Sequence, residues 1–176
     1  MINEVYGAGG NAGATYTNDF IELKNIGSAT IDVSDWSVQY CSATGTSYQV
    51  TNLTGQIPAG SSYLVQESAG TGGTTPLPSP DASGNIAMAG GAGKVALVSS
   101  QSSLICTIPN CDTAPGVVDY VGYGPTANDS ETAPTSPALT STTSASRNAA
   151  GTDSDNNSTD FTAGAPSPAN CGIDCI

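Results

Sequence analysis

The stretch DFIELKNIGSATIDVSDWSVQY, residues 19–40, decides the fold class. Ile21 and Leu23 share one side of an extended chain, whereas the other side carries Phe20, Glu22 and Lys24. This period of two predicts a strand with one buried face. Ile31 and Val33 come next, followed by the polar pair Ser34-Asp35, which predicts a turn, and by a strand from Trp36 to Cys41. Two strands joined this closely indicate an antiparallel β protein.

The same pattern continues along the chain on both sides of this stretch. Further strands are predicted at residues 2–6, 47–50, 61–67, 84–90, 93–100 and 116–124. Turns rich in Gly and Pro separate them, and no segment of about 12 residues has the 3.6-residue period of a helix. Short strands with such turns favour an antiparallel sandwich or barrel.

The length of 176 residues predicts one domain. We assign residues 1–170 to a β-sandwich domain and residues 171–176 to a Cys-containing C-terminal tail. Two stretches of low complexity, 68–84 and 126–146, are rich in Gly, Ser, Thr and Pro. They predict long loops between strands.

Charge and composition exclude several classes of function. Fifteen acidic residues face three basic ones, Lys24, Lys94 and Arg147, for a net charge of −12. This charge repels phosphates, so direct binding of nucleic acid through a basic patch is not expected. The absence of histidine removes Ser-His-Asp and Cys-His catalysis and histidine-ligated zinc. No apolar run is long enough for a membrane span.

Five cysteines indicate disulfide chemistry, because CTIPNC (106–111) and CGIDC (171–175) are closely spaced pairs. We expect Cys106 to pair with Cys111, and Cys171 with Cys175, as in an oxidising compartment. Cys41 is left over. It is either a buried free thiol or it exchanges partners with the tail pair.

The acidic stretch GTDSDNNSTDF, residues 151–161, has two interpretations. Asp153, Asp155, Asn157 and Asp160 could supply the oxygen ligands of a calcium ion. The stretch lacks the glycine and the final glutamate of an EF-hand loop, where Gly164 stands instead. The alternative is a chain of polar turns in which short side chains bond their own backbone. In either case Arg147 could pair with one of the acids.

Two further features are candidates for function. Glu4 and Glu22 would share one face if the first two strands pair, and close carboxylates can perform acid–base chemistry or hold a metal. The alternative is a solvated face beside Lys24. Trp36 is either a core anchor or, with exposed tyrosines, a platform for sugar rings. The tyrosines are Tyr6, Tyr16, Tyr40, Tyr48, Tyr63, Tyr120 and Tyr123.

In order along the chain, INEVYG (2–7), residues 19–40, IPAGSSYLVQ (57–66), VVDYVGYG (117–124) and residues 144–171 resemble the lamin tail domain in its bacterial form. The resemblance implies an immunoglobulin-like β-sandwich with no established catalytic residues. It also implies a secreted or cell-surface protein, in which such domains stand beside extracellular nucleases or other hydrolases. It places Phe161 in the core, with the acids as the turn before it and Pro166 and Pro168 after it.

We therefore expect an all-β, immunoglobulin-like antiparallel sandwich with long loops and no enzymatic activity. Its expected role is targeting, adhesion or scaffolding beside a catalytic domain such as an extracellular nuclease. The expected partner is a protein, a surface polysaccharide or another copy, and calcium is the one candidate ion. Three alternatives stay open. They are a subunit of an extracellular filament or surface layer, a carbohydrate-binding module, and a carboxylate hydrolase dependent on Glu22.

Overall fold

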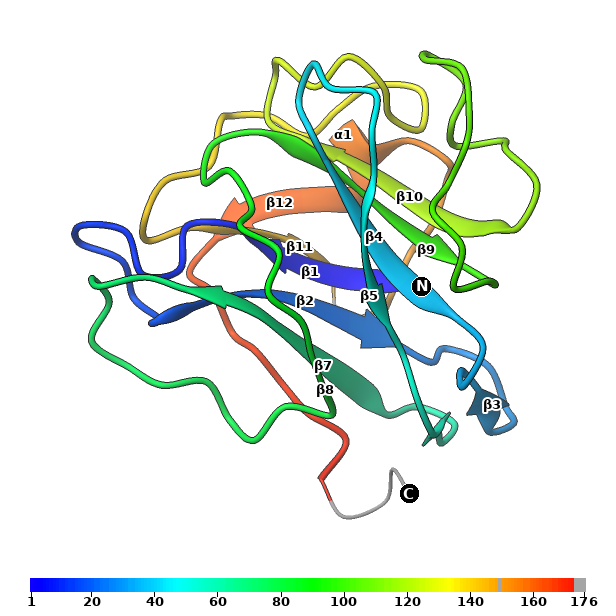
Figure 1. Cartoon of the computed structure of the whole chain (residues 1–176), viewed down its shortest axis with the longest axis horizontal. Helices are drawn as coiled ribbons and strands as arrows, with labels where there is room; N and C mark the ends of the chain where they lie inside the picture. The colour runs from blue at the N-terminus through cyan, green and yellow to red at the C-terminus, as the bar shows by residue number, and fades with distance from the viewer. Residues whose placement is uncertain (149, 173–176) are drawn as a thin grey trace.

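The computed structural model describes residues 1–148 and 150–172 and consists of two facing β-sheets joined by loops (Figure 1). The six-stranded sheet has the order β12-β11-β1-β2-β7-β8. Its strands are β1 (Ile2–Tyr6), β2 (Asn18–Lys24), β7 (Ser62–Ala69), β8 (Ala82–Ser83), β11 (Ser144–Arg147) and β12 (Phe161–Gly164).

The four-stranded sheet has the order β10-β9-β4-β5. Its strands are β4 (Ser37–Ser42), β5 (Gln49–Asn52), β9 (Gly93–Val98) and β10 (Val117–Tyr123). A two-residue ribbon pairs β3 (Ile31–Asp32) with β6 (Gln56–Ile57), and the one-turn helix α1 (Asn157–Asp160) precedes β12. All pairs of these strands are antiparallel except β7–β8, so the predicted antiparallel sandwich is confirmed.

The inner faces of the two sheets bury one continuous apolar core. Ile21 and Leu23 of β2 belong to it, as their alternation predicts, together with Val38 of β4 and Val95 of β9. Phe161 at the start of β12 is also part of this core, as the family resemblance implies. Each such side chain contributes about 1.5–3 kcal/mol on burial, so this layer is the main source of stability.

Loops cover both outer faces of the sandwich. On the six-stranded sheet, Tyr6, Phe20 and Leu64 form a small cluster against which Tyr16 and Leu77 pack from the loops. On the four-stranded sheet, a second cluster around Tyr48 and Tyr120 lies against the loop that carries Cys106 and Cys111. The chain therefore buries side chains between the two sheets and on the outer face of each sheet.

The strand predicted at residues 84–90 does not form, so this prediction is wrong. Ile86 and Met88 are buried as expected, but their backbone N–H groups donate to carboxylates. Ile86 donates to Glu67 Oε2 at 2.9 Å and Met88 to Asp19 Oδ2 at 2.8 Å. Buried side chains need satisfied backbone groups, and here side-chain acceptors replace a strand ladder.

The loop predicted over residues 126–146 contains the start of a strand that the sequence did not predict, β11. β11 lies between β1 and β12, so a strand pairs with it on each side. Its residues Ser144, Ala145 and Ser146 are small, so the segment lacks the β-branched residues that indicate a strand. Among the described residues there is no helix long and apolar enough to cross a bilayer.

Candidate functional site

Glu4 of β1 and Glu22 of β2 lie directly opposite each other in the strand register, as the sequence-based pairing assumed. Both point to the outer face of the six-stranded sheet, and both are buried. They line a polar hollow of about 380 Å³. Its other lining residues are Asn3, Lys24, Ile26, Ser62, Ser146, Arg147, Asn148, Gly151 and Ser167. The two carboxylates thus form the pair that the sequence predicted, and the pair is enclosed.

Both oxygens of Glu22 already accept hydrogen bonds from the protein. Oε1 accepts from Asn3 Nδ2 at 2.8 Å and from Ser62 Oγ at 3.0 Å. Oε2 accepts from the backbone N–H of Ala169 at 2.8 Å. Burial raises the pKa of Glu22, and these three donors oppose that shift by favouring the charged form.

Glu4 is bound in the same way by a neighbouring set of donors. Its Oε1 accepts from Ser144 Oγ at 2.6 Å and from the Ser167 backbone N–H at 2.9 Å. Its Oε2 accepts from Ser167 Oγ at 3.1 Å. A carboxylate acts as a general acid or base when one of its oxygens comes within hydrogen-bond reach of the substrate. In this structure each of the four carboxylate oxygens of Glu4 and Glu22 accepts a hydrogen bond from another part of the protein.

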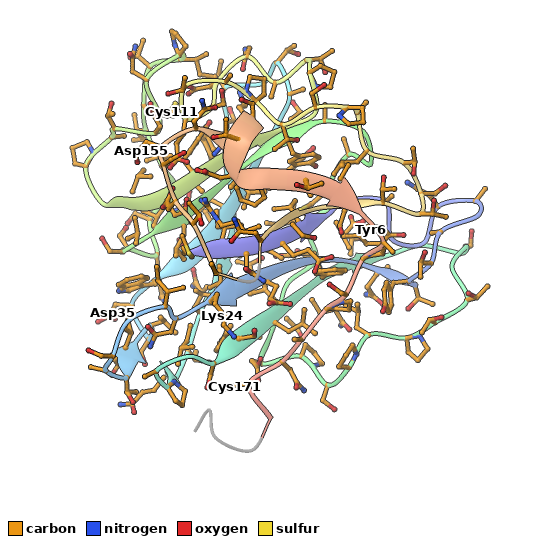
Figure 2. All side chains as sticks on the ribbon, turned by 180° about the vertical axis from the view of Figure 1, so that it is seen from behind. Tyr6, Lys24, Asp35, Cys111, Asp155 and Cys171 are labelled. Atoms are coloured by element: carbon orange, nitrogen blue, oxygen red, sulfur yellow. A yellow bond between two sulfur atoms is a disulfide. The ribbon has the colours of Figure 1, made fainter. Side chains whose placement is uncertain are left out.

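The donors at Ser167 and Ala169 belong to a segment that we call the strap, residues 165–171. It leaves β12 and crosses the outer face of the six-stranded sheet toward Cys171 (Figure 2). A third carboxylate continues the series, because Asp81 Oδ2 accepts from the Cys171 backbone N–H at 3.0 Å. We call Glu4, Glu22 and Asp81 the carboxylate row. Successive members of the row bind every second backbone N–H of the strap.

Arg147 of β11 is the centre of a second polar cluster, at one end of the sandwich. Its guanidinium contacts three carboxylates, Asp119 at 3.1 Å and Asp153 and Asp160 at 3.3 Å each. It also donates to the carbonyls of Ile2 and Thr152, and it lies 4.4 Å from the centre of the Phe161 ring. The predicted pairing of Arg147 with the acidic stretch is therefore confirmed.

The four predicted calcium ligands do not share one centre. Asp160 is buried, and it accepts from Ser154 and Arg147. Asn157 points the other way, toward β10, whereas Asp155 is exposed. Asn156 caps α1 by accepting from the backbone N–H of Ser158. The loop thus contains the polar turns of the alternative interpretation.

Calcium binding at this loop stays a prediction. Asp153 does lie near two other carboxylates, Asp119 and Glu131, and one oxygen of each falls within 4.8 Å of the others. Arg147 supplies positive charge to this group, as its contacts with Asp119 and Asp153 show. A rise in melting temperature with calcium that is lost in Asp153→Ala would establish an ion there.

Asn157 closes the outer edge of β10. Its Oδ1 accepts from the Gly122 N–H at 2.9 Å, and its Nδ2 donates to the Tyr120 carbonyl at 3.0 Å. The side-chain amide therefore binds the edge as a neighbouring strand would. Glu131 and Thr135 bond the adjacent N–H groups, of Tyr120 and Gly124. Burial raises the pKa of Glu131 to about 8.

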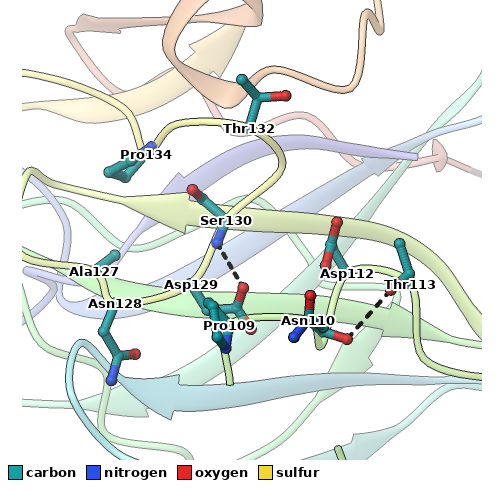
Figure 3. A pocket seen from close by; sticks show the side chains of 10 residues that line it. All are labelled: Pro109, Asn110, Asp112, Thr113, Ala127, Asn128, Asp129, Ser130, Thr132 and Pro134. Carbon is teal, nitrogen blue, oxygen red and sulfur yellow. Dashed lines mark hydrogen bonds between the residues drawn. The ribbon is translucent and has the colours of Figure 1, made fainter. Parts of the chain in front are cut away.

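A second hollow, of about 460 Å³, lies beside the disulfide loop (Figure 3). It is lined by Pro109, Asn110, Asp112, Thr113, Ala127, Asn128, Asp129, Ser130, Thr132 and Pro134. Its buried acid is structural, because Asp129 accepts from the backbone N–H groups of Cys111 and Ser130. The hollow therefore presents mostly short polar side chains.

The cysteines follow the sequence prediction where the structure describes them. Cys106 and Cys111 form a disulfide. Cys41 is a buried free thiol, opposite the buried Lys94 across β4 and β9. Cys175 lies outside the described residues, so its pairing with Cys171 stays a prediction.

The aromatic side chains do not form an exposed row. Six of the seven tyrosines are buried, and Tyr16 is half-buried. Trp36 is also half-buried and packs against the main core, which agrees with its interpretation as a core anchor.

Sequence reasoning missed Asp81, Asp119 and Glu131 as site residues. Asp81 and Asp119 accept backbone N–H groups from distant segments, and Glu131 accepts that of Tyr120. Nothing in their local sequence marks these roles. The available signal was compositional, because fifteen acidic residues and three basic ones leave most of the acids without a cation to pair with.

Comparison with models of protein families gives a match. The model of the family described as Lamin Tail Domain matches residues 1–124, which end just after β10. No curated protein matches the chain. Beyond the matched range, β11 and β12 complete the sheet beside β1.

Proposed function

We propose that this chain, which belongs to the lamin tail domain family, is a non-catalytic module for targeting, adhesion or scaffolding. The proposed setting is a secreted or cell-surface protein in which the module accompanies a catalytic domain such as an extracellular nuclease. Such a module acts through its faces, edges and loops. An immunoglobulin-like domain with many loops fits a protein-interaction role.

One observation carries the non-catalytic part of the proposal. Among the described residues, each of the eight buried carboxylates accepts a hydrogen bond from a backbone N–H group. They are Glu4, Asp19, Glu22, Glu67, Asp119, Asp129, Glu131 and Asp160. Buried acids that hold the loops and the strap against the sheets through hydrogen bonds stabilise the fold. The chain has no histidine, so carboxylates are its main catalytic option.

The experiment compares the chain alone with its Glu22→Gln variant against DNA and glycoside substrates. We expect both to be inactive. Hydrolysis by the wild type that disappears in Glu22→Gln would support the hydrolase alternative and reject the proposal. In parallel, a fusion of the chain to a fluorescent protein is sedimented with insoluble cell-wall polysaccharide or with intact cells. Retention above the fluorescent protein alone would support targeting, and no retention on any surface would contradict it.

A structural subunit is the second candidate, favoured by the outer edge of β12. Among the described residues, no backbone group of Thr162, Ala163 or Gly164 has a partner beyond β11. An open edge can pair with another chain. The carbohydrate-binding alternative has less support, because the tyrosines are mostly buried.

A further inference from the structure

We propose that the carboxylate row is a binding surface for an extended peptide, and that in assembly it takes the strap of a second copy of this chain. Two protomers are then joined because each row binds the strap of the other chain in place of its own. This inference concerns self-association, so it stands whether or not the targeting role is correct.

The row binds the backbone of the strap. Glu4, Glu22 and Asp81 accept from the N–H groups of residues 167, 169 and 171, at 2.9, 2.8 and 3.0 Å. The residues between the first two donors and before them are Pro168 and Pro166, which have no N–H. Proline also favours extended backbone, and in an extended chain of period two the N–H groups of alternate residues point to the same side. The surface therefore fits a segment with N–H groups at every second residue and proline in between.

The strap is attached in a way that allows exchange. It follows Gly164, beside which the fold leaves open space where a side chain would stand. Ser167 and Ala169 are exposed, residues 165–170 contribute no side chain to the apolar clusters, and Cys171 is the buried residue of the strap. A second copy carries the identical segment, and exchange of an identical element forms the same contacts at low cost.

The edges of the sandwich support a second copy as the occupant. The β10 edge is closed by the side chains of Asn157, Glu131 and Thr135. The β12 edge has no such partners among the described residues, and the strap begins directly behind it. The β12 edge is therefore the open edge at which a second copy can pair, and the strap of each copy starts at its own β12.

A complementation experiment with two full-length variants tests the proposal. The acceptor chain carries Ser167→Pro and Ala169→Pro, which remove two N–H donors from its strap and leave its row intact. The donor chain carries Glu4→Gln and Glu22→Gln, which weaken its row and leave its strap intact. The matched control for the acceptor is Ser167→Ala with Ala169→Gly, which keeps both N–H groups. Amide exchange confirms that the strap is released in each variant.

We expect each variant to be monomeric alone and their mixture to form a 1:1 complex in native mass spectrometry and light scattering. The control mixture should bind about a hundredfold more weakly, tenfold for each hydrogen bond to a charged acceptor, because its own strap fills the row. No complex between two variants with released straps would overturn the proposal. Equal complex formation by the control would also overturn it, since the chains would then meet elsewhere.

A peptide keeps the test valid if the donor chain does not fold. Residues 162–170, TAGAPSPAN, are titrated onto the acceptor chain and onto wild type. Binding to the acceptor chain that is lost when Ser167 and Ala169 of the peptide are N-methylated supports the row as the site. Binding that is unaffected by N-methylation, or no binding at all, refutes it.

Discussion

Arg147 of β11 donates to Asp119 of β10 at 3.1 Å, and this contact joins the six-stranded sheet to the four-stranded sheet. Both side chains are almost fully buried. The same guanidinium holds Asp160 just before β12, so one cation connects three segments that are far apart in the sequence. A buried charge of this kind is costly to leave without its partner.

Arg147→Ala should therefore be among the most destabilising substitutions in this protein. It leaves Asp119 and Asp160 buried without their cation, and breaking a buried ion pair costs about 3–5 kcal/mol. Urea unfolding monitored by Trp36 fluorescence measures the change. Lys24→Ala is the control, because the ammonium group of half-exposed Lys24 has a single hydrogen bond to the described residues, to Ser62 Oγ at 3.5 Å. A loss for Arg147→Ala no larger than that of the control would contradict the role of Arg147 as a connector.

Asn157→Leu should destabilise the fold and also change how the protein associates. The substitution removes hydrogen bonds to Gly122 and Tyr120, and each buried group left unsatisfied costs about 1–3 kcal/mol. It also uncovers the β10 edge, which becomes available to another strand. We expect a lower melting temperature together with aggregation that depends on concentration. Ser158→Ala, at the exposed neighbouring position, should show neither effect.

The sequence could predict the sandwich because the alternating apolar residues of segments such as 19–24 lie in the buried layer between the sheets. It failed where side chains replace strands. Residues 84–90 have a strand pattern, yet Ile86 and Met88 bond to Glu67 and Asp19 instead. It also failed at β11, whose small residues are held by neighbours on both sides. Acceptors that act over long sequence separations, such as Asp81 on Cys171, leave no local signal.

Part of the candidate site was predictable for the same reason. The facing of Glu4 and Glu22 follows from the pairing of two strongly patterned strands. The binding of the strap to these carboxylates does not follow from strand pairing, because it depends on where a proline-containing segment crosses the sheet. Likewise, the acidic stretch indicated a polar cluster, but the distribution of its side chains between Arg147 and β10 is set by tertiary contacts.

Reduction of the Cys106–Cys111 disulfide should have a modest and local effect. The bond closes a short loop, and the chain-entropy estimate for such a loop is about 2 kcal/mol. The Cys111 N–H is in addition held by Asp129 at 3.0 Å, so the loop keeps an anchor after reduction. We expect Cys106→Ala with Cys111→Ala to increase amide exchange in residues 99–116 while β1 and β2 stay protected. Global loss of protection would show that the loop supports the whole fold.

Stability should fall as pH rises from mildly acidic to mildly basic values. Burial raises the pKa of Asp19 from 3.8 to about 7 and that of Glu131 from 4.5 to about 8. The folded state thus binds these protons more tightly than the unfolded chain. Their contribution is complete below the unfolded values and is lost as the pH passes through about 7 and 8.

Asp160 acts in the opposite sense and sets the lower limit. Burial alone would raise its pKa, but the donors at Ser154 and Asn156 and the charge of Arg147 hold the pKa below its usual value. Its contribution is therefore lost as the pH falls through that lowered value. Together these groups predict maximal stability under mildly acidic conditions.

Asp19→Asn separates the contribution of Asp19 from the rest of the pH profile. Its free energy of unfolding should decline less steeply than that of wild type between pH 5 and 8, whatever its absolute stability, because the ionisable group is gone. Chemical denaturation at several pH values in this range gives the two slopes. Asp35→Asn, at an exposed turn position, should keep the wild-type slope. Parallel profiles for Asp19→Asn and wild type would mean that Asp19 is ionised throughout the range, with its donors at Gly9 and Met88 outweighing burial.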